Sequence, residues 1–142
     1  MNYQKGFSLI EIFVVIAILG IILAFGMTIN LSAFTTGTLQ GEESKIVSIF
    51  GRARSHAMAN MFQSPFTVCY VSTNYVISYD GTCNGSGTDE TIPANTNLTI
   101  TLTPYNITFN QLTGNTGGAT VDISDGTKVL HIIINNEGTI NW

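Results

Sequence analysis

The longest apolar run of the chain lies near its N-terminus. Residues 12–27 are apolar without a break apart from two glycines, and no charged residue occurs between Glu11 and Glu42. As an α-helix rising about 1.5 Å per residue, residues 7–30 would be roughly 36 Å long, enough to cross a hydrocarbon core of about 30 Å. Because every side of this segment is apolar, a helix buried in a globular core is disfavoured. We therefore expect a transmembrane helix over residues 7–30.

A second helical pattern follows the segment 35–41, where β-branched residues and two glycines are expected to weaken the helix. Apolar residues then recur at i, i+3, i+4 and i+7 spacing and form one stripe. They are Ile46, Ile49, Phe50, Ala53, Ala57 and Met61. Glu42 and Glu43 stand where the helix dipole favours acids, and Pro65 ends the pattern. The periodicity predicts one long helix over about residues 7–62, with a membrane half and a soluble amphipathic half.

After Pro65 the pattern changes to short β-branched runs that turn residues separate. Strands are predicted over residues 66–71, 75–79, 98–102, 107–109, 120–124, 128–134 and 139–142. Asp125 and Gly126 favour a two-residue hairpin, and Asn135 to Gly138 forms another turn. The predicted fold class is α+β: a long N-terminal helix packed on antiparallel β-sheets. Residues 31–142 should form one exported globular domain.

The charge of the chain is low, which narrows the choice of partners. Charged residues make up 10% of the sequence, compared with about 25% in typical soluble domains. The net charge is −4 and the five Lys and Arg residues are scattered. Neither nucleic acid nor anionic lipid is therefore an obvious electrostatic partner.

The orientation in the membrane follows from Lys5, which precedes the apolar run, since no cation follows until Lys45. The positive-inside rule predicts a single-pass protein with a cytoplasmic N-terminus and an exported C-terminal domain. A cleaved secretory signal peptide should have a shorter apolar region and a small-x-small cleavage site, which residues 24–26 and 32–34 match poorly. A plain signal anchor remains open, but it leaves Glu11 unexplained.

Glu11 is an unusual residue for a membrane helix, since a carboxylate at mid-bilayer costs about 2.5–3.5 kcal/mol. Cleavage between Gly6 and Phe7 would create an α-amino group four residues before Glu11, one helical turn away. The amine of one subunit and the carboxylate of its neighbour could then pair in apolar surroundings. The alternative is an interfacial glutamate that is protonated or reaches toward the headgroups.

The heptapeptide from Lys5 to Glu11, followed by the apolar run, resembles the class III signal of type IV pilins and type II secretion pseudopilins. The resemblance implies that a prepilin peptidase removes residues 1–6 by cutting after Gly6 and methylates Phe7. It implies a role for Glu11 in recruitment and register, with residues 7–30 in the core of a filament. The implied partners are other pilin or pseudopilin subunits, the peptidase and an inner-membrane assembly platform. Thr28 replaces a proline that kinks the helix in many relatives.

The soluble part resembles H-type minor pseudopilins and FimT-like minor pilins at residues 53–57, 66–69, 107–109 and 132–140, and at Gly114. This resemblance implies two small sheets packed on the helix and a minor subunit at or near the filament tip, with the domain periplasmic or extracellular. Three alternatives stay open: a major pilin, a DNA-uptake minor pilin, and a membrane-tethered binding module without a filament.

Cys69 and Cys83 are the only cysteines, and an exported domain meets an oxidising compartment. A bridge between them would stabilise the domain by about 3 kcal/mol in the chain-entropy model. If Thr73 and Asn74 form a tight turn, Cys69 faces Ser78, and Cys83 must fold back over the strand. We expect a disulfide, with two separate thiols as the alternative.

Catalytic, metal and cofactor sites find no support in the sequence, so a non-enzymatic protein is predicted. The loop after Asp80 resembles a calcium loop, but Thr82 and Thr91 occupy positions that need Asp or Asn and a bidentate Glu. His56 and His131 are isolated, and His131 is expected on a sheet face. No Ser, Cys or Lys has a base at motif spacing.

Nucleic-acid binding is disfavoured too. Arg52 and Arg54 are close together on the helix, but no Lys or Arg occurs from Val129 onward. Binding phosphates requires several cations.

Overall fold

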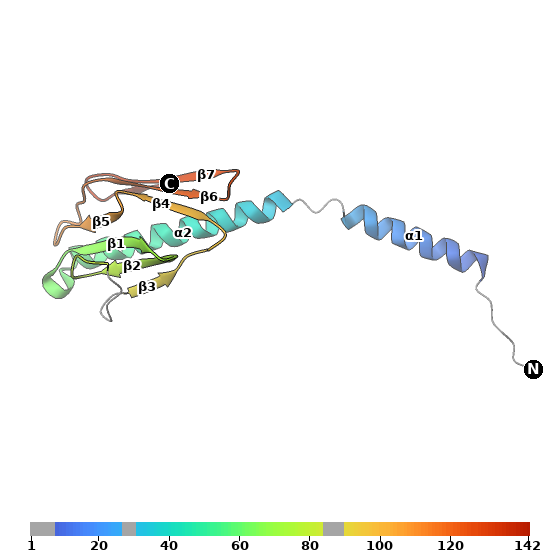
Figure 1. The fold of residues 1–142 in the computed structure, drawn as a ribbon, viewed down its shortest axis with the longest axis horizontal. Coiled ribbons are helices and arrows are strands. Elements are labelled where there is room, and N and C mark those ends of the chain that lie inside the picture. The colour runs from blue at the N-terminus through green and yellow to red at the C-terminus, as the bar shows by residue number, and fades with distance from the viewer. Residues whose placement is uncertain (1–7, 27–30, 84–89) are drawn as a thin grey trace, which may run out of the picture. The chain divides into compact units, whose positions relative to one another are not determined.

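The computed structural model describes residues 8–26, 31–83 and 90–142. The chain divides into two units, Met1–Phe34 and Thr35–Trp142. The first contains α1 (Leu9–Gly26), and most of α2 (Leu31–Met58) belongs to the second. Whether the predicted helix over residues 7–62 is continuous depends on residues 27–30, which lie outside the described residues. Figure 1 shows the strands of the second unit alongside α2.

The course of α2 corrects two details of the prediction. The helix continues without a break through residues 35–41, because Leu39 and Glu42 are buried (1% and 3% exposed) and packing outweighs weak propensity. It ends at Met58 rather than near residue 62. Asn60 takes a left-handed backbone conformation (φ 56°), and a short 3-10 turn, η1 (Met61–Gln63), follows.

The predicted apolar stripe of α2 is buried along most of its length. Ile46, Ile49, Phe50, Ala53 and Ala57 are 0–2% exposed. Met61, which the spacing placed in the same stripe, is 37% exposed because the helix has ended before it.

Two antiparallel four-stranded sheets follow, so the predicted α+β class is confirmed. Sheet A has the order β3-β2-β1-β5 and sheet B the order β4-β6-β7-β8. The strands of sheet A are β1 (Phe66–Val71), β2 (Asn74–Ser78), β3 (Glu90–Pro93) and β5 (Asn106–Phe109). Those of sheet B are β4 (Thr99–Thr103), β6 (Ala119–Ser124), β7 (Val129–Ile134) and β8 (Ile140–Asn141). Every predicted strand is present with small shifts at its ends.

Strand β3 was not predicted. It is an edge strand paired only with β2, most of its side chains are exposed, and it ends in a proline. Such a strand has no alternating apolar pattern, and its hydrogen bonds to β2 are what define it.

The turn between β1 and β2 also differs from the expectation. Ser72 and Thr73 both have positive φ (47° and 68°) and form the two-residue turn, so Val71 pairs with Asn74. Cys69 therefore lies opposite Val76, and the predicted pairing with Ser78 is wrong. This register places Tyr70 opposite Tyr75, with ring centroids 5.5 Å apart.

The core lies where the stripe of α2 meets the inner faces of both sheets. Phe50 of α2 contacts Phe109 of sheet A edge to face, with ring centroids 6.3 Å apart. Val68 and Val121, one from each sheet, are fully buried. Burying an apolar side chain of this size contributes roughly 1.5–3 kcal/mol, so the contact between the stripe and the sheets contributes strongly to the stability of the unit.

A buried carboxylate also links α2 to sheet A. Glu42 Oε1 accepts hydrogen bonds from the Tyr75 hydroxyl (2.9 Å) and from the backbone N–H of Asn95 (3.1 Å). Glu42 Oε2 accepts from Lys45 Nζ at 2.7 Å. Burial, followed by the hydrogen bond to Glu42, raises the pKa of the Tyr75 hydroxyl, which therefore stays a donor. These bonds tie α2 to β2 and to the segment after β3.

Two glycines allow the loops of the unit to close over the end of α2. Gly138 and Gly114 both have positive φ (74° and 66°), and a Cβ on Gly138 would overlap the carbonyl oxygen of Gly114. The same Cβ would lie 2.9 Å from Arg54 Nε. Arg54 Nη2 donates to the carbonyl of Glu137 at 2.9 Å. Three residues far apart in sequence therefore pack together without room for another carbon.

We expect Gly138→Ala to destabilise the protein more than Gly126→Ala. Both glycines have positive φ, which costs an alanine roughly 1–2 kcal/mol, but nothing lies within 4 Å of a Cβ on Gly126. At Gly138 the overlap with Gly114 should add roughly 1–3 kcal/mol. Urea unfolding of the full chain in detergent, followed by circular dichroism, measures the difference. Equal losses of stability would show that the close approach is unimportant.

Candidate functional site

The candidate site at the N-terminus is built on the first turn of α1. The carbonyl oxygen of Ser8 accepts hydrogen bonds from the N–H groups of Glu11 (3.0 Å) and Ile12 (3.3 Å), so the helix begins directly after Ser8. Glu11 is the acidic residue of this first turn. The partial positive charge of a helix N-terminus stabilises a carboxylate at this position. The sequence Ser8-x-x-Glu11 also has the capping-box spacing, a local signal that the resemblance alone did not use.

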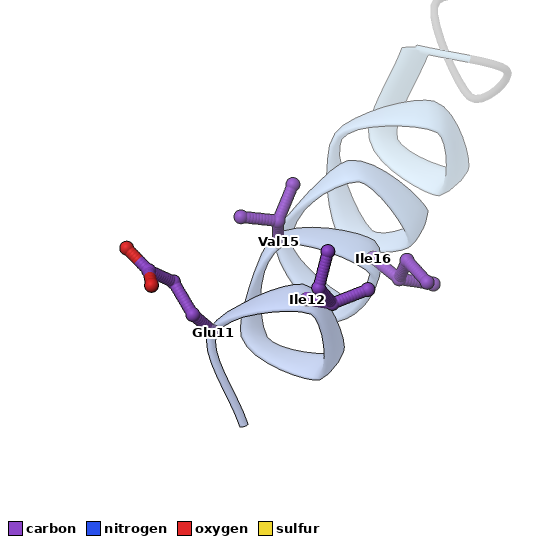
Figure 2. Close-up of a pocket in the computed structure, with 4 residues that line it drawn as sticks. All are labelled: Glu11, Ile12, Val15 and Ile16. Carbon is purple, nitrogen blue, oxygen red and sulfur yellow. The ribbon is translucent and has the colours of Figure 1, made fainter. Parts of the chain in front are cut away.

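Glu11 is the only charged residue of α1, and its surroundings are apolar. Figure 2 shows the side chain of Glu11 projecting from the first turn near Val15, with Ile12 and Ile16 on an adjoining side of the helix. These four residues line one shallow hollow on the helix. A carboxylate in this setting can accept an ion pair or hydrogen bond from a cation that approaches from another molecule.

The large apolar side chains of α1, from Leu9 to Leu23, are 50–75% exposed. Among the described residues of the first unit, none covers these side chains. The helix therefore requires an apolar environment or an apolar partner. Within the described residues, no helix meets both the length and the apolarity that crossing a membrane requires. Gly6, Phe7 and residues 27–30, which belong to the predicted leader, cleavage site and membrane segment, lie outside the described residues.

The structure joins Cys69 and Cys83 by a disulfide, with their Cα atoms 6.2 Å apart. Cys69 lies on the face of sheet A that points away from α2, where Thr67, Val76 and Ser78 are also buried (0–3% exposed). Asp80 Oδ1 accepts hydrogen bonds from Ser78 Oγ and from the N–H and hydroxyl of Thr82, both at 2.9 Å. The bond from Ser78, and then those from Thr82, lower the pKa of Asp80. Asp80 thus caps its own turn.

The two arginines weighed for nucleic-acid binding have partners within the chain. Arg52 Nη1 lies 3.0 Å from Glu90 Oε1, and Arg54 donates to the carbonyl of Glu137. Both side chains are held by the fold, and neither adds to a cluster of cations that could follow a phosphate backbone.

The histidines occupy separate places. His56 packs edge to face on Phe66, with ring centroids 5.3 Å apart. His131 is exposed on β7, on the face of the sheet as expected, and its Nδ1 lies 2.7 Å from Asp122 Oδ1. In the part of the chain that the structure describes, no three His, Cys, Asp or Glu residues are grouped as metal ligands would be.

Sequence reasoning missed one surface, which we call the α2-end patch and define as Met58, Met61, Phe62 and Leu112. All four side chains are exposed where α2 ends, and Leu112 comes from a distant loop. The only local signal was Asn60, a residue that tolerates the left-handed conformation that ends the helix. The hydrogen bond from the N–H of Leu112 to the carbonyl of Ala57 had no signal in the sequence.

A family model described as the prokaryotic N-terminal methylation motif matches residues 1–27. No curated protein and no solved structure shows a significant match to the chain. The match covers the heptapeptide from Lys5 to Glu11 and the whole of α1, and it confirms the resemblance found there. The N-terminal segment therefore carries the prokaryotic N-terminal methylation motif, which supports the resemblance to type IV pilin-like proteins.

Proposed function

We propose that this chain is a non-enzymatic structural subunit of a type IV pilus-like or type II secretion filament. In this proposal a prepilin peptidase cleaves between Gly6 and Phe7 and methylates Phe7. The observation that carries it is the methylation motif at residues 1–27, which precedes an exposed apolar helix with Glu11 in its first turn.

Assembly then follows from the chemistry of α1. Cleavage leaves an amine on Phe7, four residues before Glu11, and the Glu11 side chain lies beside apolar side chains. An ion pair within one helix would not join two subunits. The amine of one subunit can instead pair with Glu11 of the next, and this ion pair links them. The apolar side chains of α1 pack against those of neighbouring subunits, and the ion pair sets their register. Other subunits and an inner-membrane assembly platform are the partners in this step.

Before assembly, residues 7–30 anchor the chain in the inner membrane, with the N-terminus cytoplasmic and the globular domain periplasmic or extracellular. The charge order Lys5, apolar run, Lys45 supports this orientation. The disulfide between Cys69 and Cys83 supports export, since such bonds persist in oxidising compartments.

Within the filament we place the chain as a minor subunit near the tip. Two four-stranded sheets beside α2 are what the resemblance to H-type minor pseudopilins implies. Arg54, Gly114 and Gly138, which come from three segments of that resemblance, meet in one tightly packed contact. A major pilin is the alternative, since the same fold would also suit a shaft.

The first prediction concerns processing. In cells with an active prepilin peptidase, the intact mass of the membrane-extracted chain should show loss of residues 1–6 and one added methyl group. Cells without the peptidase should yield the full-length, unmethylated chain as the control. A chain that still begins at Met1 in peptidase-active cells would refute the proposed function.

The second prediction separates a filament subunit from a membrane-tethered binding module. Glu11→Ala should lower incorporation into filaments by roughly a hundredfold or more, since it leaves a desolvated amine without its partner. Membrane insertion should be unchanged. Glu43→Ala, which removes the same charge from α2, is the matched control and should assemble normally. Immunoblots of sheared filaments and of membranes measure both quantities, and normal assembly of Glu11→Ala would favour the tethered module.

The third prediction concerns stoichiometry. Quantitative mass spectrometry of sheared filaments should find this chain at a small fraction of the dominant subunit. The reason is that a tip has few positions, whereas a shaft repeats one heterologous contact many times. A chain that dominates the filament would be a major pilin, and its assignment to the tip would be wrong.

A further inference from the structure

The disulfide joins two cysteines that differ in how far the fold encloses them. Cys69 is 1% exposed and lies on β1, which pairs with β2 on one side and with β5 on the other. Cys83 follows β2, belongs to no strand and is only partly buried. A thiol that attacks the bond from outside therefore reaches the sulfur of Cys83 more easily than that of Cys69.

The position of Cys69 in the sheet does not depend on the disulfide. The register of β1 places Cys69 opposite Val76 of β2 and opposite Asn106 of β5. The next residue towards the start of the strand, Val68, points to the other face and packs in the core that α2 and both sheets share. Cys69 itself is not part of that core, so we expect β1 to keep its place when the disulfide is opened.

Cys83 is brought over the sheet by a turn that has its own hydrogen bonds. Asp80 Oδ1 accepts a bond from Ser78 Oγ at the end of β2. It also accepts bonds from the N–H and from the hydroxyl of Thr82, both at 2.9 Å. These bonds direct the chain between β2 and Cys83 without help from the disulfide. They hold the thiol of Cys83 near Cys69 and so raise its effective concentration there.

We propose that Cys83, and not Cys69, is the site at which an exported thiol–disulfide oxidoreductase forms its mixed disulfide with this chain, an inference that rests on the export included in the proposed function. Enzymes of this class act in the oxidising compartments where structural disulfides form. The partly exposed sulfur of Cys83 is the one that such an enzyme can approach while the globular unit is folded.

The bond forms in two exchange steps. The thiolate of Cys83 attacks the disulfide of the oxidised enzyme, and one enzyme sulfur leaves as a thiolate. The thiolate of Cys69 then attacks the sulfur of Cys83, which closes the disulfide and releases the second enzyme sulfur. Two electrons pass from the cysteine pair to the enzyme, and the two thiol protons end on the enzyme's dithiol.

Opening of the bond follows the same route in reverse. An external thiolate attacks the sulfur of Cys83, and Cys69 leaves as a thiolate that takes up a proton. Attack on the sulfur of Cys69 would first require a local opening of the sheet face that encloses it. Exchange at Cys69 in the folded chain is therefore expected to be at least about tenfold slower than exchange at Cys83.

Glutathione tests this preference on the full-length chain in detergent. The oxidised chain is treated with a limiting amount of glutathione, quenched with acid and alkylated, and the mixed disulfides are mapped by mass spectrometry. Glutathione should be found on Cys83 at least about tenfold more often than on Cys69. In urea, where the fold encloses neither cysteine, this preference should disappear. Equal labelling of the two cysteines in the folded chain, or a preference of the same size in urea, would overturn the proposal.

The turn at Asp80 has a test of its own, which starts from the reduced chain and glutathione disulfide. Asp80→Ala removes the acceptor of the turn. Closure of the Cys83 adduct onto Cys69 should therefore slow about threefold or more, while the first exchange at Cys83 keeps its rate. Asp80→Asn retains a side-chain oxygen and should restore fast closure. Asp125→Ala is the matched control, because Asp125 Oδ1 accepts equivalent bonds in the turn between β6 and β7. Unchanged closure in Asp80→Ala would show that the turn does not position Cys83.

A comparison in cells separates this inference from the proposed function. Cys69→Ser removes the thiol that resolves the mixed disulfide, so an adduct with an exported oxidoreductase should accumulate on Cys83. Cys83→Ser should accumulate at least about tenfold less adduct on Cys69. Intact mass on the same samples shows whether residues 1–6 are removed. If they are removed and Cys69→Ser accumulates no more adduct than Cys83→Ser, the inference about Cys83 fails alone. If they are retained in cells with an active prepilin peptidase, the proposed function fails.

Discussion

The burial of one face of α2 is the interaction on which the globular unit depends. Sheets A and B each have an inner apolar face, and the stripe that includes Ile46, Phe50 and Ala53 covers both. A sheet with one apolar face must bury that face against another element, so neither sheet is expected to persist without the helix. This constraint explains why α2 remains helical through residues 35–41, where propensity alone is weak.

Apolar packing alone does not set how α2 is placed along the sheets, because a stripe can slide or rotate with little loss of contact. Glu42 restricts this freedom. A carboxylate that is 3% exposed is costly unless its hydrogen bonds are made, and only one placement of α2 brings it to both Tyr75 and Asn95. We regard Glu42 as a residue that specifies the arrangement more than one that stabilises it.

What the sequence could predict was the structure that local patterns determine. The stripe of α2 and the strands of both sheets followed from periods of 3.6 and 2, and the site at Glu11 followed from its spacing to Gly6 and Phe7. The turn between β1 and β2 was misplaced by one residue, which is a local error, but the other differences involve contacts between distant segments. The end of α2 at Met58 depends on Leu112, β3 is defined by its pairing with β2, and the surroundings of Glu42 come from three parts of the chain.

The surface of α1 and that of the globular unit differ in what they can specify. The side chains of α1 are apolar all round, so they pack with equal ease against lipid or against any similar helix, and Glu11 is the one group that distinguishes positions along it. Such a helix can set register but discriminates poorly between subunits. Choice of neighbour must then come from the globular unit, whose shape and chemistry are particular to this sequence.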